Sequence, residues 1–327
     1  MAMDRDLAVA FVRAWSARRS GPLVGWEMLA ATGARGLRIV RETGAFRDFA
    51  LTEANPTAFE VLAANARTVP GARAIASDAH RVPPGGPFDY VDLDPYGTPV
   101  PFVEVALASV RPSGVLAVTA TDMPVLAGAQ RASCEARYGA RPIRGRLGPE
   151  GGLRILLAYL DRTSRTGERG IRPLLAYVRG HHLRAFVQVE AAPPRESPVG
   201  RIDPATWTGP PLGRVGPFGP LWIGPLFDPE LVRTLASPPT AAEPGPTEKF
   251  LARLREEVDV DVPFYYEPNE IAASLSLSFP PSRERMFAGL REAGYRAART
   301  HARPEGFRTD APRTVVEEVA RAASSPH

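Results

Sequence analysis

The chain has 327 residues, of which 44% are hydrophobic, and this is enough for two domains with hydrophobic cores. No run of about 18 apolar residues is present, so we expect no membrane span, and the N-terminus lacks the pattern of a secretory signal. The single cysteine, Cys134, excludes an internal disulfide, and no Cys/His group has the spacing of a zinc site. We therefore expect a cytoplasmic protein that uses no metal.

The net charge of +4 and a pI near 9.5 mildly favour a polyanionic partner. However, the basic residues are 39 arginines and one lysine, Lys249, and proline is also very frequent. Such a skew is typical of genome-wide nucleotide bias. Arginine content alone is therefore weak evidence for binding of nucleic acid.

The first part of the chain predicts a helix, a buried strand and a glycine loop. Apolar residues at helical spacing indicate a helix over residues 8–15, and residues 24–30 indicate a strand. The loop over residues 31–36, which contains Thr32, Gly33 and Arg35, precedes a second helix. A glycine loop in this place lets a ligand approach backbone amides at a helix N-terminus.

The next two predicted strands each end in an acidic residue. Residues 49–53 end in Glu53, twenty residues after Gly33, which is the usual place of a partner for a ribose diol. Residues 74–79 contain Asp78, which suits an adenine amino group. A dinucleotide would favour glycine where Ala31 stands, whereas S-adenosylmethionine has no phosphate and tolerates alanine. The glycine loop and the two acidic strand ends therefore suit S-adenosylmethionine better than a hydride-transfer cofactor.

A further strand leads into Asp94-Pro95-Tyr96-Gly97. Pro95 has no N–H to pair and Gly97 permits a tight turn, so the chain leaves the sheet here. The carboxylate could accept a proton from an exocyclic amine of a base, and the phenol ring could stack on that base. The alternative is a strand-ending turn with an acidic cap. For Asp92 we favour a structural role, bonded to loop amides, over that of a second acid.

The middle of the chain predicts a helix over residues 102–110, a strand over 115–122, a helix over 151–160 and two paired strands over 174–178 and 185–189. Residues 131–146 contain an arginine cluster: Arg131, Arg137, Arg141, Arg144 and Arg146. His181 and His182 would face opposite ways, with no third metal ligand in sight.

Residues 191–220 are rich in proline and glycine and indicate a connector. After it, helices over residues 247–258, 269–275 and 282–293 and a hairpin over 295–301 and 306–309 suggest a winged-helix-like module. Six arginines of this region would face a phosphate backbone: Arg283, Arg285, Arg291, Arg296, Arg299 and Arg308. The alternative is a solvated surface in an arginine-rich protein.

Several stretches together resemble the tRNA guanine-N2 (di)methyltransferases that modify guanine 26 of tRNA. The resemblance runs over nearly the whole chain, and its most telling pieces are residues 3–6, 31–38, 92–99, 119–122, 152–156, 180–187, 219–226 and 294–301. Asp4, Glu53 and Tyr96 stand where the family usually has Asn, Asp and Phe, and each keeps the required chemistry.

The resemblance implies a class I, Rossmann-like methyltransferase domain over residues 1–190, a connecting segment over 191–227 and a tRNA-binding α+β domain over 228–327. It implies S-adenosylmethionine as cofactor and tRNA as partner, and we expect a monomer. The cofactor-binding residues are expected to be Arg5, Thr32, Gly33, Arg35, Glu53, Asp78 and Ala79. Asp94, Pro95 and Tyr96 are expected to form the catalytic site.

The expected reaction is transfer of methyl groups to the exocyclic N2 of guanine, giving N2-methyl- and N2,N2-dimethylguanosine. One alternative is a non-catalytic RNA-binding protein with a decayed methyltransferase domain. The short segment before Asp4 supports it, and the intact Asp94-Pro95-Tyr96-Gly97, Glu53 and Asp78 oppose it. The other is a nicotinamide-dependent oxidoreductase, which Ala31 disfavours.

Overall fold

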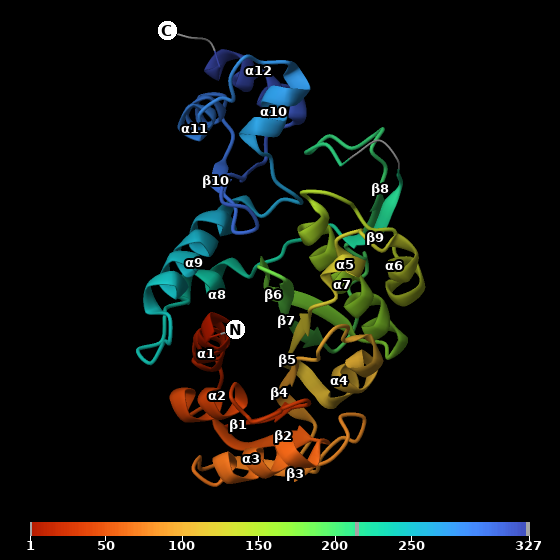
Figure 1. The fold of residues 1–327 in the computed structure, drawn as a ribbon, viewed down its shortest axis with the longest axis vertical. Coiled ribbons are helices and arrows are strands. Elements are labelled where there is room, and N and C mark those ends of the chain that lie inside the picture. Colours follow the sequence, from red (N-terminus) through yellow and green to blue (C-terminus); the bar gives the residue numbers. More distant parts are fainter. Residues whose placement is uncertain (1, 213–215, 325–327) are drawn as a thin grey trace.

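The computed structural model describes residues 2–212 and 216–324 and is built around one seven-stranded sheet (Figure 1). The strands are β1 Leu23–Glu27, β2 Phe46–Glu53, β3 Ala72–Ala76, β4 Phe88–Leu93, β5 Val110–Ala120, β6 Gly170–Arg179 and β7 His182–Glu190. Their order across the sheet is β3-β2-β1-β4-β5-β7-β6, and only β7 runs antiparallel to its neighbours. The predicted α/β sheet with a terminal strand pair is confirmed.

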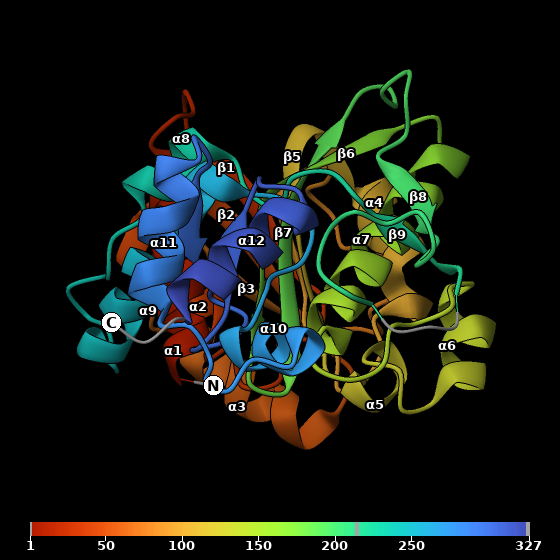
Figure 2. The same ribbon diagram turned by 90° about the horizontal axis from the view of Figure 1, so that it is seen from above.

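Helices cover both faces of this sheet. They are α1 Ala2–Ser16, α2 Gly36–Thr43, α3 Pro56–Ala66, the 3₁₀ turn η1 Val100–Phe102, α4 Val103–Ser109, α5 Met123–Leu126, α6 Arg131–Tyr138 and α7 Gly148–Thr166. α1 and α2 lie on one side of the sheet and α4 and α7 on the other (Figure 2). Every residue of the central strands β1 and β4 is buried, as expected for parallel strands that are covered on both faces.

The segment that we predicted as a connector contains regular structure. Strands β8 (Val199–Ile202) and β9 (Phe218–Trp222) form a two-stranded antiparallel sheet. Arg154 of α7 donates hydrogen bonds to the carbonyls of Trp222 and Gly224, at 2.9 and 3.2 Å, and Trp222 is buried. The strands escaped prediction because glycine and proline interrupt their alternation. Residues 213–215 of this segment lie outside the described part.

The remaining elements include the three helices and the hairpin that the sequence predicts, in that order, and two further helices. They are α8 Pro229–Thr234, α9 Pro244–Glu257, the turn η2 Val258–Val260, α10 Pro268–Leu275, α11 Arg283–Glu292, β10 Ala297–Arg299, β11 Phe307–Thr309 and α12 Arg313–Ala323. Helices α8 and α12 were not predicted. Whether the arrangement is a winged helix, and where the domain boundaries fall, stay predictions.

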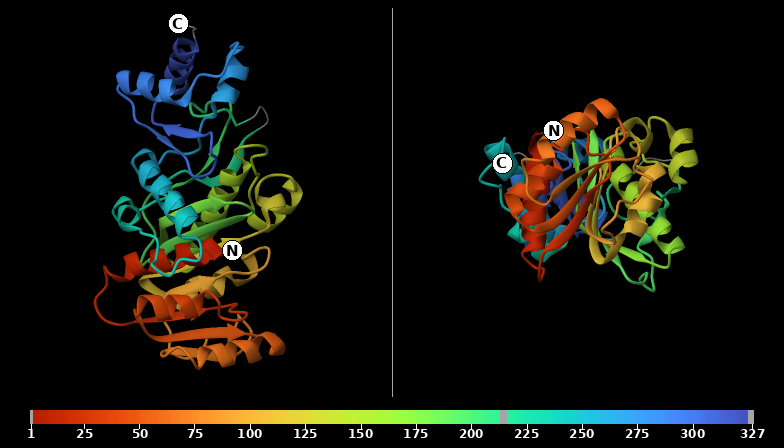
Figure 3. Two further views of the ribbon diagram at one scale, coloured as in Figure 1. Left: turned by 60° about the vertical axis from the view of Figure 1, so that its left-hand side comes forward. Right: turned by 90° about the horizontal axis from the view of Figure 1, so that it is seen from below.

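The buried side chains form two cores. The main core extends from the sheet to Phe264, and a second core contains Tyr266, Met286, Phe307 and Val316. We call residues 266–323, which enclose this second core, the C-terminal module. It lies at the end of the molecule beside β6, whereas β3 lies at the opposite end (Figure 3).

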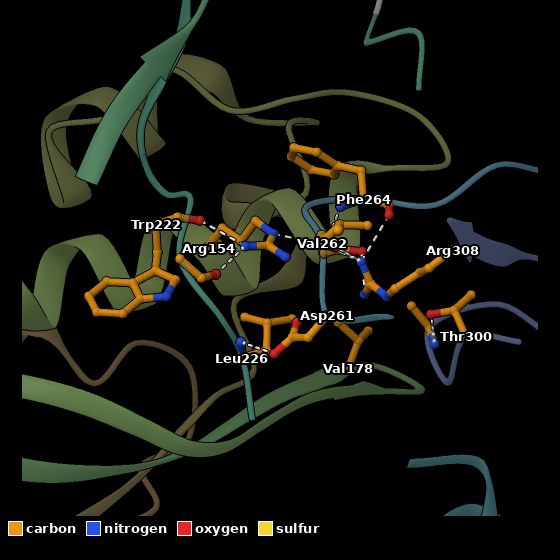
Figure 4. A network of polar contacts seen from close by, with 12 residues as sticks. Arg154, Val178, Trp222, Leu226, Asp261, Val262, Phe264, Thr300 and Arg308 are labelled. Carbon is orange, nitrogen blue, oxygen red and sulfur yellow. Dashed lines mark hydrogen bonds and ion pairs between the residues drawn. The ribbon is translucent and has the colours of Figure 1, made fainter. Parts of the chain in front are cut away.

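One of the six arginines that we predicted to face a phosphate backbone lies inside the protein instead. Arg308 of β11 is fully buried, and its guanidinium bonds Glu150 of α7, at 3.0 and 2.9 Å, and Glu257 of α9. It also donates to the carbonyls of Val262 and Phe264, at 2.6 and 2.9 Å (Figure 4). The prediction for Arg308 was wrong because its carboxylate partners are distant in sequence. The residue joins the C-terminal module to the sheet domain.

Replacement of Arg308 by leucine should be strongly destabilising. The change leaves Glu150 and Glu257 buried without their shared cation, and breaking such a buried pair costs about 3–5 kcal/mol. Urea denaturation measures this loss in the free energy of unfolding. The control is Arg296→Gln, since the ion pair of Arg296 with Asp310 is exposed and should contribute at most about 1 kcal/mol. Equal losses in the two variants would contradict the role given to Arg308.

Candidate active site

The loop that follows β4 is held at the carboxyl edge of the sheet. Gly97, with a φ of 89°, donates its N–H to Thr121 Oγ1 at 2.7 Å, and the N–H of Thr121 donates to the Gly97 carbonyl at 2.9 Å. These bonds fix the loop to the end of β5. Pro95 is buried, the Asp94 side chain is 24% exposed, and Tyr96 is fully exposed. The loop therefore presents a partly shielded carboxylate beside a free aromatic ring.

Arg35 connects this carboxylate to a second one. Its Nη1 lies 2.7 Å from Asp94 Oδ2 and 3.2 Å from Asp92 Oδ1. The sequence placed Arg35 among the cofactor contacts, and the structure places it directly against the catalytic candidate. That contact fixes one oxygen of Asp94. Among the described residues nothing bonds Asp94 Oδ1, which leaves this oxygen for a substrate.

Asp92 is enclosed by the protein and has a structural role. Arg184 of β7 donates to both its oxygens, at 3.0 and 2.6 Å, and the Tyr90 hydroxyl donates to Oδ2 at 2.7 Å. Burial alone would raise its pKa, but the charges of Arg184 and Arg35 hold the pKa of Asp92 below its usual range. Its partners are arginines and a tyrosine, not the loop amides that we expected. Asp92 is only 1% exposed, so it is no second acid for a substrate.

Glu27 is a member of this cluster that sequence reasoning missed. It ends β1 in register with Asp92, is buried, and accepts the Gly36 N–H at 3.2 Å. Burial and the charge of Asp92 raise its pKa to about 8. Three carboxylates and two guanidiniums meet here, so one proton on Glu27 makes the cluster neutral. The sequence feature that could have revealed Glu27 is an acidic residue inside an otherwise apolar predicted strand, residues 24–30.

The loop between β1 and α2 and the end of β2 adjoin this cluster. Ala31, with a φ of 48°, and Thr32 are exposed, and Gly33, with a φ of 78°, is buried. Glu53 accepts the N–H of Ala31 at 2.9 Å and that of Asn55 at 2.7 Å. The carboxylate thus shapes the loop that a ligand would approach.

The end of β3 lies beside the end of β2, because Glu53 pairs with Ala76 in the parallel ladder. Asp78 follows, with a side chain that is 58% exposed, and its Oδ1 accepts the His80 N–H at 2.8 Å. Ala79 is buried. Glu53, Asp78 and Asp94 therefore follow the ends of β2, β3 and β4 along one edge, as the sequence predicts.

Arg5 lies between two acidic residues that hold α1 in place. Asp4 bonds His182 at 2.7 Å and Arg179 at 3.0 Å, and Asp6 accepts from Arg38 at 2.7 Å. Arg5 is half-buried and makes no side-chain hydrogen bond within residues 2–212 and 216–324. Its expected contact with a cofactor stays a prediction.

Among the described residues, no group of three or more His, Cys, Asp or Glu side chains could hold a metal ion, and no helix is long and apolar enough to cross a membrane. A cavity of about 510 Å³ lies between the loop before α7 and helices α10 and α12. None of the catalytic or cofactor candidates lines it.

A model of the family described as N2,N2-dimethylguanosine tRNA methyltransferase matches residues 1–201 and 212–321. The chain belongs to this family. It is 36% identical to the tRNA (guanine(26)-N(2))-dimethyltransferase of Thermococcus kodakarensis, over 98% of this chain and 91% of the relative. It is 34% identical to the enzyme of that name from Pyrobaculum arsenaticum, over 98% of this chain and 89% of the relative.

The structure is similar to a solved structure of Trm1 from Pyrococcus horikoshii with S-adenosyl-L-methionine. The similarity covers 98% of the present chain and 92% of the Trm1 chain. The TM-score is 0.86 and the identity 30%. The likeness confirms the expected methyltransferase fold. The roles of individual residues in the site stay predictions.

Replacement of Glu27 by glutamine should remove a dependence of stability on pH. Below pH 4.5, the ordinary pKa of glutamate, the carboxyl is protonated in both the folded and the unfolded protein. Between pH 4.5 and about pH 8, the carboxyl loses its proton only in the unfolded chain, because the folded protein raises its pKa to about 8. The stability of the native protein should therefore fall as pH rises through this window, by an amount on the order of 3 kcal/mol. Urea denaturation at pH 5 and pH 8 measures it.

The matched control is Glu60→Gln, at an exposed position of α3. As pH rises, the free energy of unfolding of Glu27→Gln should increase relative to that of the native protein. The free energy of unfolding of Glu60→Gln should change with pH in the same way as that of the native protein. A constant difference between Glu27→Gln and the native protein would show that Glu27 is ionised when buried.

Proposed function

We propose that this chain transfers methyl groups from S-adenosylmethionine to N2 of guanine 26 in tRNA, giving N2-methyl- and N2,N2-dimethylguanosine. The names of the relatives and the S-adenosylmethionine complex of P. horikoshii Trm1 support this reaction. The main observation in its support is that one loop presents both Asp94, of which one oxygen bonds Arg35, and the fully exposed ring of Tyr96. A carboxylate next to a free aromatic ring suits a base that carries an exocyclic amine.

The donors along the sheet edge fit S-adenosylmethionine. The exposed loop at Ala31 and Thr32 precedes the N-terminus of α2, where backbone amides can meet the amino-acid carboxylate of that cofactor. Glu53 suits the ribose hydroxyls and Asp78 the adenine amine, since each oxygen can accept more than one hydrogen bond. The bound cofactor supplies an electrophilic methyl group.

Asp94 acts as the hydrogen-bond acceptor and base for the guanine amine. The lone pair of that nitrogen is delocalised into the ring, so the nitrogen is a poor nucleophile. A carboxylate that accepts one of its protons localises the lone pair and removes the proton as the new bond forms. Arg35 keeps the carboxylate in place during this step, because it also bonds the buried Asp92.

Tyr96 provides a surface for the target base. A guanine in folded tRNA must leave its stack before an enzyme can reach its N2. The Tyr96 ring is fully exposed, so stacking on a base would cover it. Stacking on an aromatic side chain contributes about 1–3 kcal/mol per base.

The non-catalytic alternative is less well supported. A decayed site would have no need of Arg35 against Asp94, nor of a loop fixed by Gly97 and Thr121. The cytoplasmic location and the monomeric state stay predictions.

Asp94→Asn should bind the cofactor product normally and lose about 10²–10⁴ in turnover, the range for a general base. Mass spectrometry of nucleosides from a tRNA transcript incubated with S-adenosylmethionine measures the methylated guanosines. Calorimetry with adenosylhomocysteine is the control for an intact cofactor site. Full activity of the variant would place the base elsewhere.

Tyr96→Ala should impair methylation of tRNA about 5- to 150-fold in kcat/KM, as expected for the loss of one stacking contact. Tyr96→Phe keeps the ring and should remain close to the native enzyme. Because the side chain is fully exposed, neither variant should unfold more easily. A large loss in Tyr96→Phe would show instead that the hydroxyl, rather than the ring, is needed.

A further inference from the structure

A hollow of about 360 Å³ between α6 and the small β8–β9 sheet is lined by arginines. Arg131 begins α6, Arg141 follows that helix, and Arg201 lies on β8. The backbones of Arg141 and Gly219 exchange two hydrogen bonds of 2.9 Å, and Arg141 Nη1 donates to the Gly216 carbonyl at 3.1 Å. These bonds join the segment after α6 to β9, so the two walls of the hollow are fixed relative to each other.

Three arginines line this hollow together with one carboxylate, Glu135, so its positive charge is not balanced. Arg162 of α7 lies next to Gly139 of the lining, is half-buried and donates to the Tyr138 carbonyl. Burial and the charge of Arg201 lower the pKa of Arg162, whereas Tyr159 and Asp161 act in the opposite direction. Within the described residues, neither Arg162 nor Arg201 has an ion pair with a carboxylate. Arg131 has one with Glu135, which is exposed and therefore weak.

This imbalance distinguishes the arginines of the hollow from the buried arginines of the protein. Buried arginines elsewhere, such as Arg154, Arg184 and Arg308, each bond a carboxylate. Like charges held together repel each other unless an anion lies between them. A fixed group of guanidiniums with few carboxylates is therefore suited to a phosphate, which accepts several hydrogen bonds from arginine.

The hollow is also next to the catalytic loop. The segment that contains α6 begins where β5 ends, at the same carboxyl edge as Asp94. The Tyr138 hydroxyl at the end of α6 bonds Thr98 Oγ1 at 2.7 Å, four residues after Asp94, and it also bonds Asp122 at 2.9 Å. An eight-residue helix is about 12 Å long, so the arginines lie within a few nucleotides of a bound guanine.

We propose that the hollow lined by Arg131, Arg141 and Arg201 binds a backbone phosphate of the tRNA near the methylated guanine. The proposal rests on the proposed function and adds to it a contact made by the methyltransferase domain itself. Such contacts give no base readout, and they position a nucleic acid on the protein. The hollow therefore helps to hold the tRNA while the guanine turns toward Tyr96 and Asp94.

The test is the double variant Arg131→Gln and Arg201→Gln. Its tRNA affinity should fall roughly tenfold at 0.15 M salt, and the slope of log affinity against log salt should become shallower by about 1–2, because fewer counterions are released. KM for tRNA should rise with little change in kcat. Adenosylhomocysteine should bind as before.

Arg47→Gln and Arg67→Gln together form the matched control. Both arginines are exposed and lack carboxylate partners among the described residues, and they lie at the opposite edge of the sheet, near the start of β2 and the end of α3. This pair removes the same charge. If it weakens tRNA binding as much as the hollow variant does, the hollow has no specific role and the proposal is overturned.

Thermal unfolding separates binding from structure. Arg201 is exposed and has no ion pair with a carboxylate among the described residues, so its replacement should leave the unfolding temperature unchanged while tRNA binding weakens. A lower unfolding temperature with unchanged binding would contradict the proposal. The nucleoside assay on the native protein tests the proposed function by itself. If the native protein forms no methylguanosine in this assay, but the double variant of Arg131 and Arg201 still binds tRNA more weakly, the proposed reaction is refuted and the phosphate site is not.

Discussion

The candidate active site depends on one buried carboxylate, Asp92, and on the two arginines that bond it. Arg184 comes from β7, and it meets Asp92 only if β7 pairs with β5 in the observed register. Arg35 comes from the start of α2 and extends past Asp92 to Asp94. A buried ion pair is weak evidence for stability, because desolvation of the charges offsets much of their attraction. Its contribution here is geometric, since it fixes the position of Asp94 through groups that cannot reach solvent.

A second buried network joins the C-terminal module to the sheet domain. Arg308 bonds Glu150 and Glu257, and His301 Nδ1 contacts Glu257 at 2.6 Å. His301 Nε2 accepts the N–H of Val178 on β6 at 3.1 Å, so this nitrogen carries no proton and Nδ1 donates to Glu257. These contacts fasten the module to the sheet domain, which carries the candidate active site. Removal of the chain after β9 would take from the buried Glu150 its bonds to Arg308 and to the N–H of Phe264, so point variants are the cleaner test of the role of the module.

Features that are local in sequence could be predicted, and features that depend on distant partners could not. Glu53, Asp78 and Asp94 each lie at or just after the end of a parallel strand, so their shared edge follows from the strand pattern alone. Arg308 could not be separated from its exposed neighbours such as Arg296, because Glu150 is 158 residues away in sequence. Strands β8 and β9 were hidden by their glycines and prolines. The position of Arg35 against Asp94 depends on how the N-terminus of α2 lies beside the end of β4, which no local pattern predicts.

The arginines of this protein show how far composition falls short of function. Their number reflects a general bias and says nothing about which of them meet RNA. The structure divides them by their surroundings: Arg184 and Arg308 are buried in ion pairs with carboxylates and hold the fold, whereas Arg131, Arg141 and Arg201 line a hollow with a single carboxylate, Glu135. An unbalanced charge costs stability unless something outside the chain balances it. An anionic substrate is the kind of ligand that would balance the charge of this hollow.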